Sequence, residues 1–339
     1  MTDTQTRKIR YGIIGFGLFA ERAIAGAIKD SPNSELVAIQ KRSLALARQK
    51  ADALSVPYAF SSPAELVACP DVDAVFIVSA NSAHHDETVT AARGGKHVLV
   101  EKPIAMNASE AQHMIDECEQ HRVKLMVGQV VRFSPVVRRL RDLVQSGSLG
   151  RIISAKADYS FNARLSKRLW FYDRAVAGGG PVFDIGIHCL DTLSYILDDQ
   201  VRSVQSMLSP LPTATATERT AILGLQYSKG TLASITCSFE APTRHIYIEI
   251  IGTDGLASST DFTLSATRVR LNVIHRTDTI ETEEQTIDFN VPNLYVDEVT
   301  AFSDCILNGM ESPVPGKEAW HHQKVLDLAL RGGGTISHS

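Results

Sequence analysis

The sequence lacks the features that would place the protein in a membrane, on a nucleic acid or in an oxidising compartment. No apolar run approaches the roughly 20 residues that a membrane-spanning helix needs. The net charge is -4, so Lys and Arg provide no excess that would attract a nucleic acid or an anionic membrane. The 339 residues include only five cysteines, none in a CxxC pair. This predicts reduced thiols, with neither a disulfide framework nor a metal site.

A targeting signal is also missing from the start of the chain. Residues 1–8 are largely polar and an apolar stretch follows at once, whereas a secretory leader joins a basic start to a longer apolar run. We therefore expect a cytoplasmic protein without a membrane or nucleic-acid partner. Hydrophobic residues make up 44% and charged residues 21% of the chain, which is ordinary for a globular protein, and the length predicts two domains.

The first positive signal is a glycine-rich turn. An apolar stretch at 8–15 leads into the run GFGLFA at 15–20, and a helical stretch follows at 21–29. In a G-x-G-x-x-A turn the first glycine permits a tight turn, the second lets the backbone approach a pyrophosphate, and the small last residue allows the helix to pack on the strand. A purely structural turn is the alternative. The strand before it and the helix after it favour dinucleotide binding.

The second predicted strand, 35–40, ends without the acid that would bind an NAD ribose. NAD-binding domains place Asp or Glu about 20 residues after the glycines, where it accepts a hydrogen bond from the 2′-hydroxyl. Here the strand is followed by Lys41, Arg42 and Ser43, and two cations with a hydroxyl suit a 2′-phosphate. These residues could instead be a solvated start to the helix at 44–54. The missing acid favours the phosphate, and hence NADP.

The rest of the first half alternates between strands and helices, which is typical of a parallel sheet covered on both faces. The apolar run at 98–100 leads into Glu101, Lys102 and Pro103. Open α/β sheets bind ligands at the carboxyl ends of their strands, so these charged residues are candidates for a site. The predicted strands are 73–79, 97–101 and 124–127, and the predicted helices are 61–67, a helix ending at Arg93, and 108–121.

The second half predicts a mainly antiparallel sheet, because several strand-like runs alternate and are separated by turns. The division is therefore a Rossmann dinucleotide-binding domain over 1–127 and an α+β domain for substrate binding and oligomerisation over 128–339. Residues 332–339 are predicted to be frayed. The predicted strands are 151–161, 204–208, 221–227, 231–239, 246–252, 267–275 and 284–289, and the predicted helices are 136–146, 181–197, 296–308 and 318–330.

The predicted helix at 181–197 is apolar almost all round. Its polar face carries Asp184, His188 and Asp191 at positions i, i+4 and i+7. A helix this apolar is buried, so the polar face must meet other polar groups. A satisfied interior Asp–His pair is one explanation, and a metal site would need further ligands that the spacing does not supply. With the dinucleotide turn upstream, a catalytic role is favoured.

Together these patterns resemble the Gfo/Idh/MocA oxidoreductase family over nearly the whole chain. The Glu-Lys-Pro and Gly-Gly-Gly…Asp…His pieces in this order are quite specific. The resemblance rests on the turn at 15–20, Asn81-x-x-His84, the Gly95–Val98 approach to Glu101-Lys102-Pro103, Gly128 followed by Arg132-Phe133, and the Gly178-Gly179-Gly180-x-x-x-Asp184-x-Gly186-x-His188-x-x-Asp191 motif.

The resemblance implies a Rossmann domain, a second domain with a large open antiparallel sheet, and a nicotinamide cofactor. It implies oxidation or reduction at a hydroxyl-bearing carbon, usually of a sugar or polyol, in a homodimer or homotetramer joined through the open sheet. The family's catalytic residues fall on Lys102, Asp184 and His188. The predicted cofactor-binding residues are Gly15, Phe16, Gly17, Leu18, Phe19, Ala20, Lys41, Arg42, Ser43, Ser79, Asn81, His84, Glu101 and Lys102.

Two departures from the family pattern bear on the cofactor. Ala80 replaces a usual proline, and Lys41 replaces the acid of NAD-preferring members, which favours NADP while NAD stays possible. Whether Lys102 or His188 exchanges the proton stays open, as does whether the aromatic residues at 170–172 line a pocket or the core. A cofactor-binding regulator without chemistry is the alternative function. The presence of both Lys102 and His188 disfavours it.

Overall fold

The computed structural model describes residues 7–165, 169–264, 266–276 and 282–336, and the chain forms two compact units. The first unit contains the chain up to Gly128 together with Tyr295–Trp320. The second contains Gln129–Leu294 and the chain from His321 onward. The division predicted from the sequence, 1–127 and 128–339, did not include the return of Tyr295–Trp320 to the first unit.

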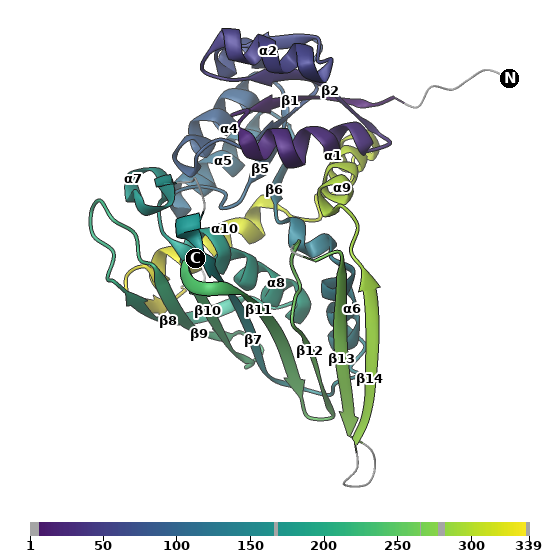
Figure 1. The fold of residues 1–339 in the computed structure, drawn as a ribbon, viewed down its shortest axis with the longest axis vertical. Coiled ribbons are helices and arrows are strands. Elements are labelled where there is room, and N and C mark those ends of the chain that lie inside the picture. The colour runs from purple at the N-terminus through teal and green to yellow at the C-terminus, as the bar shows by residue number, and fades with distance from the viewer. Residues whose placement is uncertain (1–6, 166–168, 265, 277–281, 337–339) are drawn as a thin grey trace, which may run out of the picture. The chain divides into compact units, whose positions relative to one another are not determined.

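A parallel sheet forms the centre of the first unit, as predicted, and it has six strands (Figure 1). The strand order is β3-β2-β1-β4-β5-β6, so the order reverses direction between β1 and β4. Every residue of β4 is buried, which shows that both faces of the sheet are covered there. The strands are β1 (Ile9–Ile14), β2 (Ser34–Gln40), β3 (Tyr58–Phe60), β4 (Ala74–Ile77), β5 (His97–Glu101) and β6 (Leu125–Gly128).

The helices of the first unit begin close to where the sequence places them. The helix after the glycine-rich turn starts as a π-turn, and α3 begins with a capping box between Ser62 and Glu65. Strand β3 was not predicted, because three residues are too short to show a period. The helical elements up to Gly128 are η1 (Ala20–Ile24), α1 (Ala25–Asp30), α2 (Leu44–Leu54), α3 (Pro63–Val67), η2 (Asn81–Ala83), α4 (His84–Arg93) and α5 (Ala108–Gln120).

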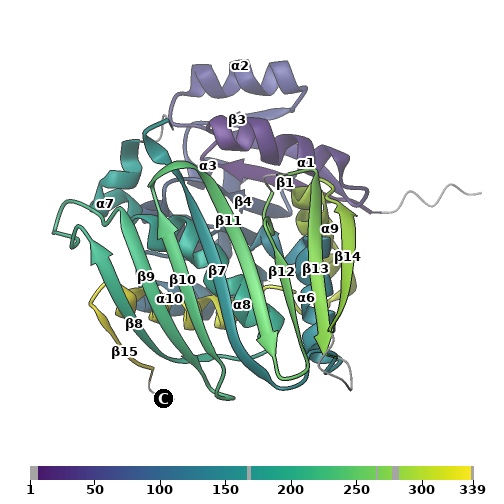
Figure 2. The ribbon, with the colours of Figure 1, turned by 60° about the horizontal axis from the view of Figure 1, so that its bottom comes forward.

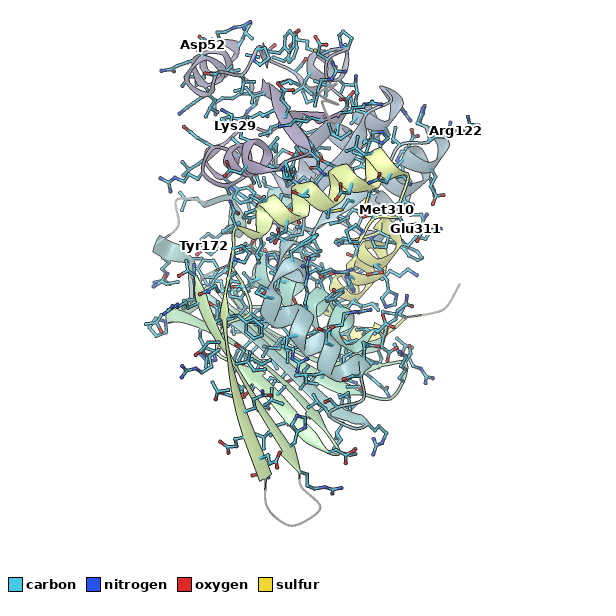
Figure 3. All side chains as sticks on the ribbon, turned by 90° about the vertical axis from the view of Figure 1, so that its right-hand side faces the viewer. Lys29, Asp52, Arg122, Tyr172, Met310 and Glu311 are labelled. Carbon is cyan, nitrogen blue, oxygen red and sulfur yellow. The ribbon has the colours of Figure 1, made fainter. Side chains whose placement is uncertain are left out.

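Helix α9 (Leu294–Asn308) belongs to the first unit almost entirely. The Tyr11 hydroxyl on β1 lies 2.8 Å from the Ser303 hydroxyl, and Asn33 donates to Asp304 at 2.8 Å. These bonds join residues 292 and 271 positions apart, which explains why local patterns did not show this packing. Figure 3 marks Met310 and Glu311 in the segment that leads from α9 to α10 (Gly316–Ala329).

A nine-stranded mixed sheet forms the second unit, antiparallel except where β7 pairs with β10. Helices α6 (Pro135–Gln145), α8 (Ile187–Leu197) and α10 lie behind the sheet in Figure 2, and the other face is turned to the viewer. The order is β14-β13-β12-β11-β7-β10-β9-β8-β15. The strands are β7 (Ile152–Asn162), β8 (Val201–Ser209), β9 (Thr220–Tyr227), β10 (Leu232–Ser238), β11 (Glu240–Gly252), β12 (Gly255–Ser259), β13 (Arg268–Arg276), β14 (Thr282–Asn290) and β15 (Gly333–Thr335).

The prediction of a frayed end at 332–339 is wrong for most of that stretch. Strand β15 pairs with β8, and Ile336 beyond it is buried. Glycine-rich sequence carries no strand period, so only the pairing partner identifies this strand. Residues 337–339 lie outside the described part of the chain. Strand β12 was missed for a similar reason, since Gly255–Ser259 consists mostly of small residues.

Candidate active site

The glycine-rich turn joins the carboxyl ends of three neighbouring strands. Gly15 follows β1 with φ +81°, and a Cβ there would lie 2.7 Å from the Ser79 backbone, so only glycine fits. The Gly15 and Phe16 amides donate to the side chain and carbonyl of Gln40, at 3.0 and 2.8 Å. At Gly17 an added Cβ would meet nothing nearer than 3.7 Å. The turn therefore offers open backbone, as a pyrophosphate requires.

The end of β2 brings positive charge to this turn. The Lys41 ammonium donates to the Phe16 carbonyl at 3.1 Å, and Arg42 beside it is exposed. Ser43 is the N-cap of α2 and accepts a hydrogen bond from the Leu46 amide. Two cations and a helix N-terminus therefore meet where an NAD-binding domain has an acid, and this surface fits a phosphate. Gln40, which ties the turn to β2, was not among the predicted site residues.

The segment after β4 contains three predicted site residues, Ser79, Asn81 and His84, and each has different surroundings. Ser79 donates to the carboxyl of Glu87, and burial raises the pKa of that carboxyl to about 7 in spite of the hydrogen bond. Asn81 is buried at the start of a short 3₁₀-turn. His84 is also buried, and its Nδ1 donates to the Pro103 carbonyl at 2.9 Å. Burial lowers the pKa of His84 to about 4, so the ring is neutral and supports the turn after β5.

The turn after β5 carries Glu101 and Lys102 at the carboxyl edge of the sheet. Glu101 accepts a hydrogen bond from the Lys102 amide at 3.2 Å. A Cβ at Gly128 on the neighbouring strand would lie 3.4 Å from the Glu101 carboxylate, so glycine leaves room for it. Glu298 of α9 is fully buried, and burial and then the Glu101 charge raise its pKa well above the ordinary value. Glu298 carries no local signal, because its neighbours come from another part of the chain.

In the second unit, a buried carboxylate caps the start of the helix that carries Asp184 and His188. A π-turn at Val182–Gly186 leads directly into α8. The Glu218 carboxylate accepts hydrogen bonds from the amides of Gly180 and Val182, at 2.9 and 3.1 Å. A Cβ at Gly180 would collide with the Glu218 carbonyl, which explains the glycine before this helix. Glu218 lies 36 residues after Val182, beyond the end of the helix, and was not predicted.

Asp184 and His188 are only half-buried, whereas the apolar residues between them are buried. The His188 ring lies beside the Tyr159 ring of β7, with centroids 6.4 Å apart. Burial raises the pKa of Tyr159 to about 12, with a further rise from Asp184 that Arg244 opposes. The phenol is therefore a hydrogen-bond donor at neutral pH. The second unit thus gathers a carboxylate, an imidazole and a phenol, and Tyr159 was missed because nothing local marks it.

Asp191, the third residue of the polar face, is fully buried and paired. The Arg132 guanidinium donates to both of its oxygens, at 2.8 and 2.6 Å, and His322 lies 3.4 Å away. Burial alone would raise the pKa of Asp191, but Arg132 and His322 outweigh it and hold the pKa at about 2. The polar face of the helix therefore has two parts. Asp184 and His188 are half-buried, whereas Asp191 is buried and bound to Arg132. Within the described ranges, no group of three or more His, Cys, Asp or Glu residues is arranged to hold a metal ion.

The three aromatic residues at 170–172 differ in burial. Phe171 is buried and stacks on Phe239 with ring centroids 5.4 Å apart, so it belongs to the core. Trp170 and Tyr172 are half-buried beside it. A pocket role therefore stays open for those two residues alone.

A doubly wound sheet with a dinucleotide turn at the reversal of its strand order, joined to a second α+β unit, defines an NAD(P)-binding oxidoreductase. Residues 9–129 match a family described as "Oxidoreductase family, NAD-binding Rossmann fold", and residues 137–258 match the GFO/IDH/MocA C-terminal domain. The chain belongs to the Gfo/Idh/MocA family, as its motifs predicted. No helix in the described part of the chain is long and apolar enough to cross a membrane.

Known relatives of this chain include enzymes that are named for sugar substrates. It is 31% identical to 1,5-anhydro-D-fructose reductase of Ensifer adhaerens over 73% of this chain and 74% of that protein. It is 29% identical to D-xylose 1-dehydrogenase (NADP(+)) 2 of Haloferax volcanii over 96% and 97%. The crystal structure of aldose-aldose oxidoreductase from Caulobacter crescentus matches with a TM-score of 0.87 and 24% identity, over 97% of this chain and all of that one.

Proposed function

We propose that this chain is an NADP(H)-dependent dehydrogenase or reductase that acts at a hydroxyl-bearing carbon of a sugar, polyol or related compound. The observation that carries the proposal is that Asp184 and His188 are half-buried on a helix whose other residues, apart from Tyr195, are buried, in a chain whose other unit has a dinucleotide turn. Two relatives are named for anhydrofructose and xylose, which supports a polyhydroxylated substrate.

The residues of the first unit fit the cofactor. The turn at Gly15 and Gly17 would hold the pyrophosphate with its backbone, and Lys41, Arg42 and Ser43 would hold the 2′-phosphate. We also assign Phe16, Leu18, Phe19 and Ala20 to the turn, and Ser79, Asn81, His84, Glu101 and Lys102 to the nicotinamide end, His84 through its bond to Pro103. When bound, the nicotinamide supplies or accepts the hydride.

Removing hydride from a carbinol carbon, or adding it to a carbonyl, requires a proton to leave or join the oxygen. We assign His188 as general acid and base, because histidine ordinarily titrates near pH 6.5. Asp184 orients the imidazole or holds a substrate hydroxyl. The Lys102 ammonium stabilises negative charge on the oxygen. In the alternative assignment Lys102 is itself the base, and the substitutions in the Discussion separate the two.

Cofactor choice gives the first prediction. We expect kcat/KM for NADP(H) to exceed that for NAD(H) at least tenfold, a difference of about 1.4 kcal/mol, because Lys41 and Arg42 stand where an acid would repel the 2′-phosphate. Lys41→Asp should remove this preference. Lys50→Ala, two turns along α2, is the matched control and should keep it. Equal efficiency of wild-type protein with both cofactors contradicts the prediction.

Assembly gives the second prediction, a homodimer or homotetramer joined through the sheet face opposite α6 and α8. Met207, Ile222 and Leu232 on neighbouring strands are 67%, 43% and 57% exposed on that face. Burying them against a second copy would be favourable. Light scattering at micromolar concentration should give a multiple of 37.0 kDa. Ile222→Asp should lower that mass, while Leu44→Asp on exposed α2 should not. A 37.0 kDa wild-type particle refutes the prediction.

A regulator that binds the cofactor without chemistry is the competing function, and one screen separates the two. NADPH oxidation and NADP reduction are measured against sugars, inositols and dihydrodiols, with cofactor binding followed by nucleotide fluorescence. Turnover of any member of the panel supports the enzyme. Tight cofactor binding with no turnover across the panel would favour the regulator.

A further inference from the structure

Arg132, Asp191 and His322 form a buried charged cluster that the proposed chemistry does not use. We call these three residues the Asp191 cluster. The Arg132 Nε and Nη2 atoms donate to the two carboxylate oxygens at 2.8 and 2.6 Å, and His322 Nδ1 lies 3.4 Å from Oδ1. All three side chains are at most 5% exposed. The Arg132 guanidinium also lies over the Tyr195 ring, 5.2 Å from its centroid.

The cluster joins three separate parts of the second unit. Asp191 is on α8, three residues after His188, so their side chains are neighbours on the helix surface. The second unit begins at Gln129 and is re-entered at His321, and Arg132 and His322 lie directly after these two points. Asp191 therefore ties the helix of Asp184 and His188 to two segments that arrive from the first unit.

A buried ion pair is weak evidence for a contribution to stability. Removing two charges from water costs about as much as their attraction returns, and apolar replacements of similar size are often neutral or stabilising. A bidentate fork does fix orientation, because two parallel hydrogen bonds allow neither rotation nor sliding of the carboxylate. The geometry therefore suits positioning of α8 better than stabilisation of the fold.

We propose that the Asp191 cluster positions the helix that carries Asp184 and His188, which makes Arg132, Asp191 and His322 positioning residues for the reaction. The inference rests on the proposed function, because it assigns the reaction to that helix. One turn of α8 separates the fixed carboxylate from His188, so loss of the fork lets the imidazole leave its productive orientation. Small misplacements of a catalytic group are costly in rate.

The test separates positioning from stability by a double substitution. Asp191→Leu alone leaves the Arg132 charge buried without its partner and should lower the melting temperature. Arg132→Met combined with Asp191→Leu should restore the melting temperature. We expect the double variant to keep a wild-type Kd for NADP(H), to lose at least tenfold in kcat, and to show an altered pH profile. A double variant with wild-type kcat and pH profile overturns the proposal.

A second arginine–aspartate pair in the same unit serves as a matched control. Arg141 of α6 also lies over the Tyr195 ring, 4.5 Å from its centroid, and pairs with Asp198 just after α8, at 2.9 Å, but this pair is exposed. Arg141→Met should leave kcat unchanged. If the double variant does not fold, Arg132→Lys keeps the charge without the fork and should show the same loss of kcat. Normal turnover of Arg132→Lys then overturns the proposal.

A readout without turnover keeps this inference distinct from the proposed function. The imidazole Hε1 signal of His188, assigned with His188→Gln, is followed by NMR as a function of pH. We expect both its chemical shift and its titration midpoint to change in the double variant. An unchanged His188 signal overturns the positioning role, even where no substrate of the panel is turned over. Failure of the wild-type protein in the screen instead counts against the proposed function.

Discussion

Replacing Lys102 by alanine is expected to lower kcat by about 10² or more, with little change in the Kd for NADP(H). The ammonium follows β5 at the carboxyl edge of the parallel sheet, where doubly wound folds bind their ligands. In the proposed mechanism its positive charge stabilises the developing alkoxide, and that interaction is stronger in the transition state than in the ground state. Steady-state kinetics on a verified substrate, with fluorescence titration of the cofactor, measures both quantities.

Lys124→Ala is the matched control for this substitution. Lys124 directly precedes β6, so it lies at the amino edge of the same sheet and should be dispensable for turnover. An unchanged kcat for Lys102→Ala would show that Glu101 and Lys102 serve the turn after β5 and not the chemistry. A loss of cofactor affinity with normal kcat would instead make Lys102 a binding residue only.

The fold could be predicted wherever the pattern is local. The helix at 44–54 and the strand at 97–101 are observed with the predicted bounds, because each has its own period, cap or stop. The return of Tyr295–Trp320 to the first unit could not be predicted. The contacts that hold it, such as Tyr11 to Ser303, have no signal in either segment alone. Strand β15 fails in the same way, since only its partner β8 makes Gly333–Thr335 a strand.

For the candidate site too, residues with a local pattern could be predicted and residues defined by distant contacts could not. The glycine-rich turn and the cations after β2 were predicted because the chemistry there belongs to consecutive residues. Tyr159, Glu218 and Glu298 were not, since each meets its neighbours across the fold. The position of a residue in a motif also does not reveal how deeply its side chain is buried. His84 and His188 both occupy motif positions, yet the first is enclosed and bonded to Pro103, while the second is half-buried.

The two histidines at motif positions differ in how well they suit acid–base chemistry. A ring that is buried, neutral and committed to the Pro103 carbonyl cannot exchange protons with a substrate, so His84 is a structural support. His188 is half-buried on a helix whose other residues, apart from Asp184 and Tyr195, are buried, and Tyr159 beside it remains a donor. Among the imidazoles at motif positions, His188 is therefore the one suited to acid–base work.

Replacing His188 by alanine is expected to lower kcat by about 10² or more, because a positioned acid–base group contributes roughly this factor. His275→Ala, on β13 of the same unit, is the matched control and should turn over normally. The pH profile of the residual activity decides the assignment. If His188 exchanges the proton, the limb of the pH profile that reports its titration disappears in His188→Ala and persists in Lys102→Ala. The reverse pattern assigns the base to Lys102. Near-normal turnover of both variants would reject the site.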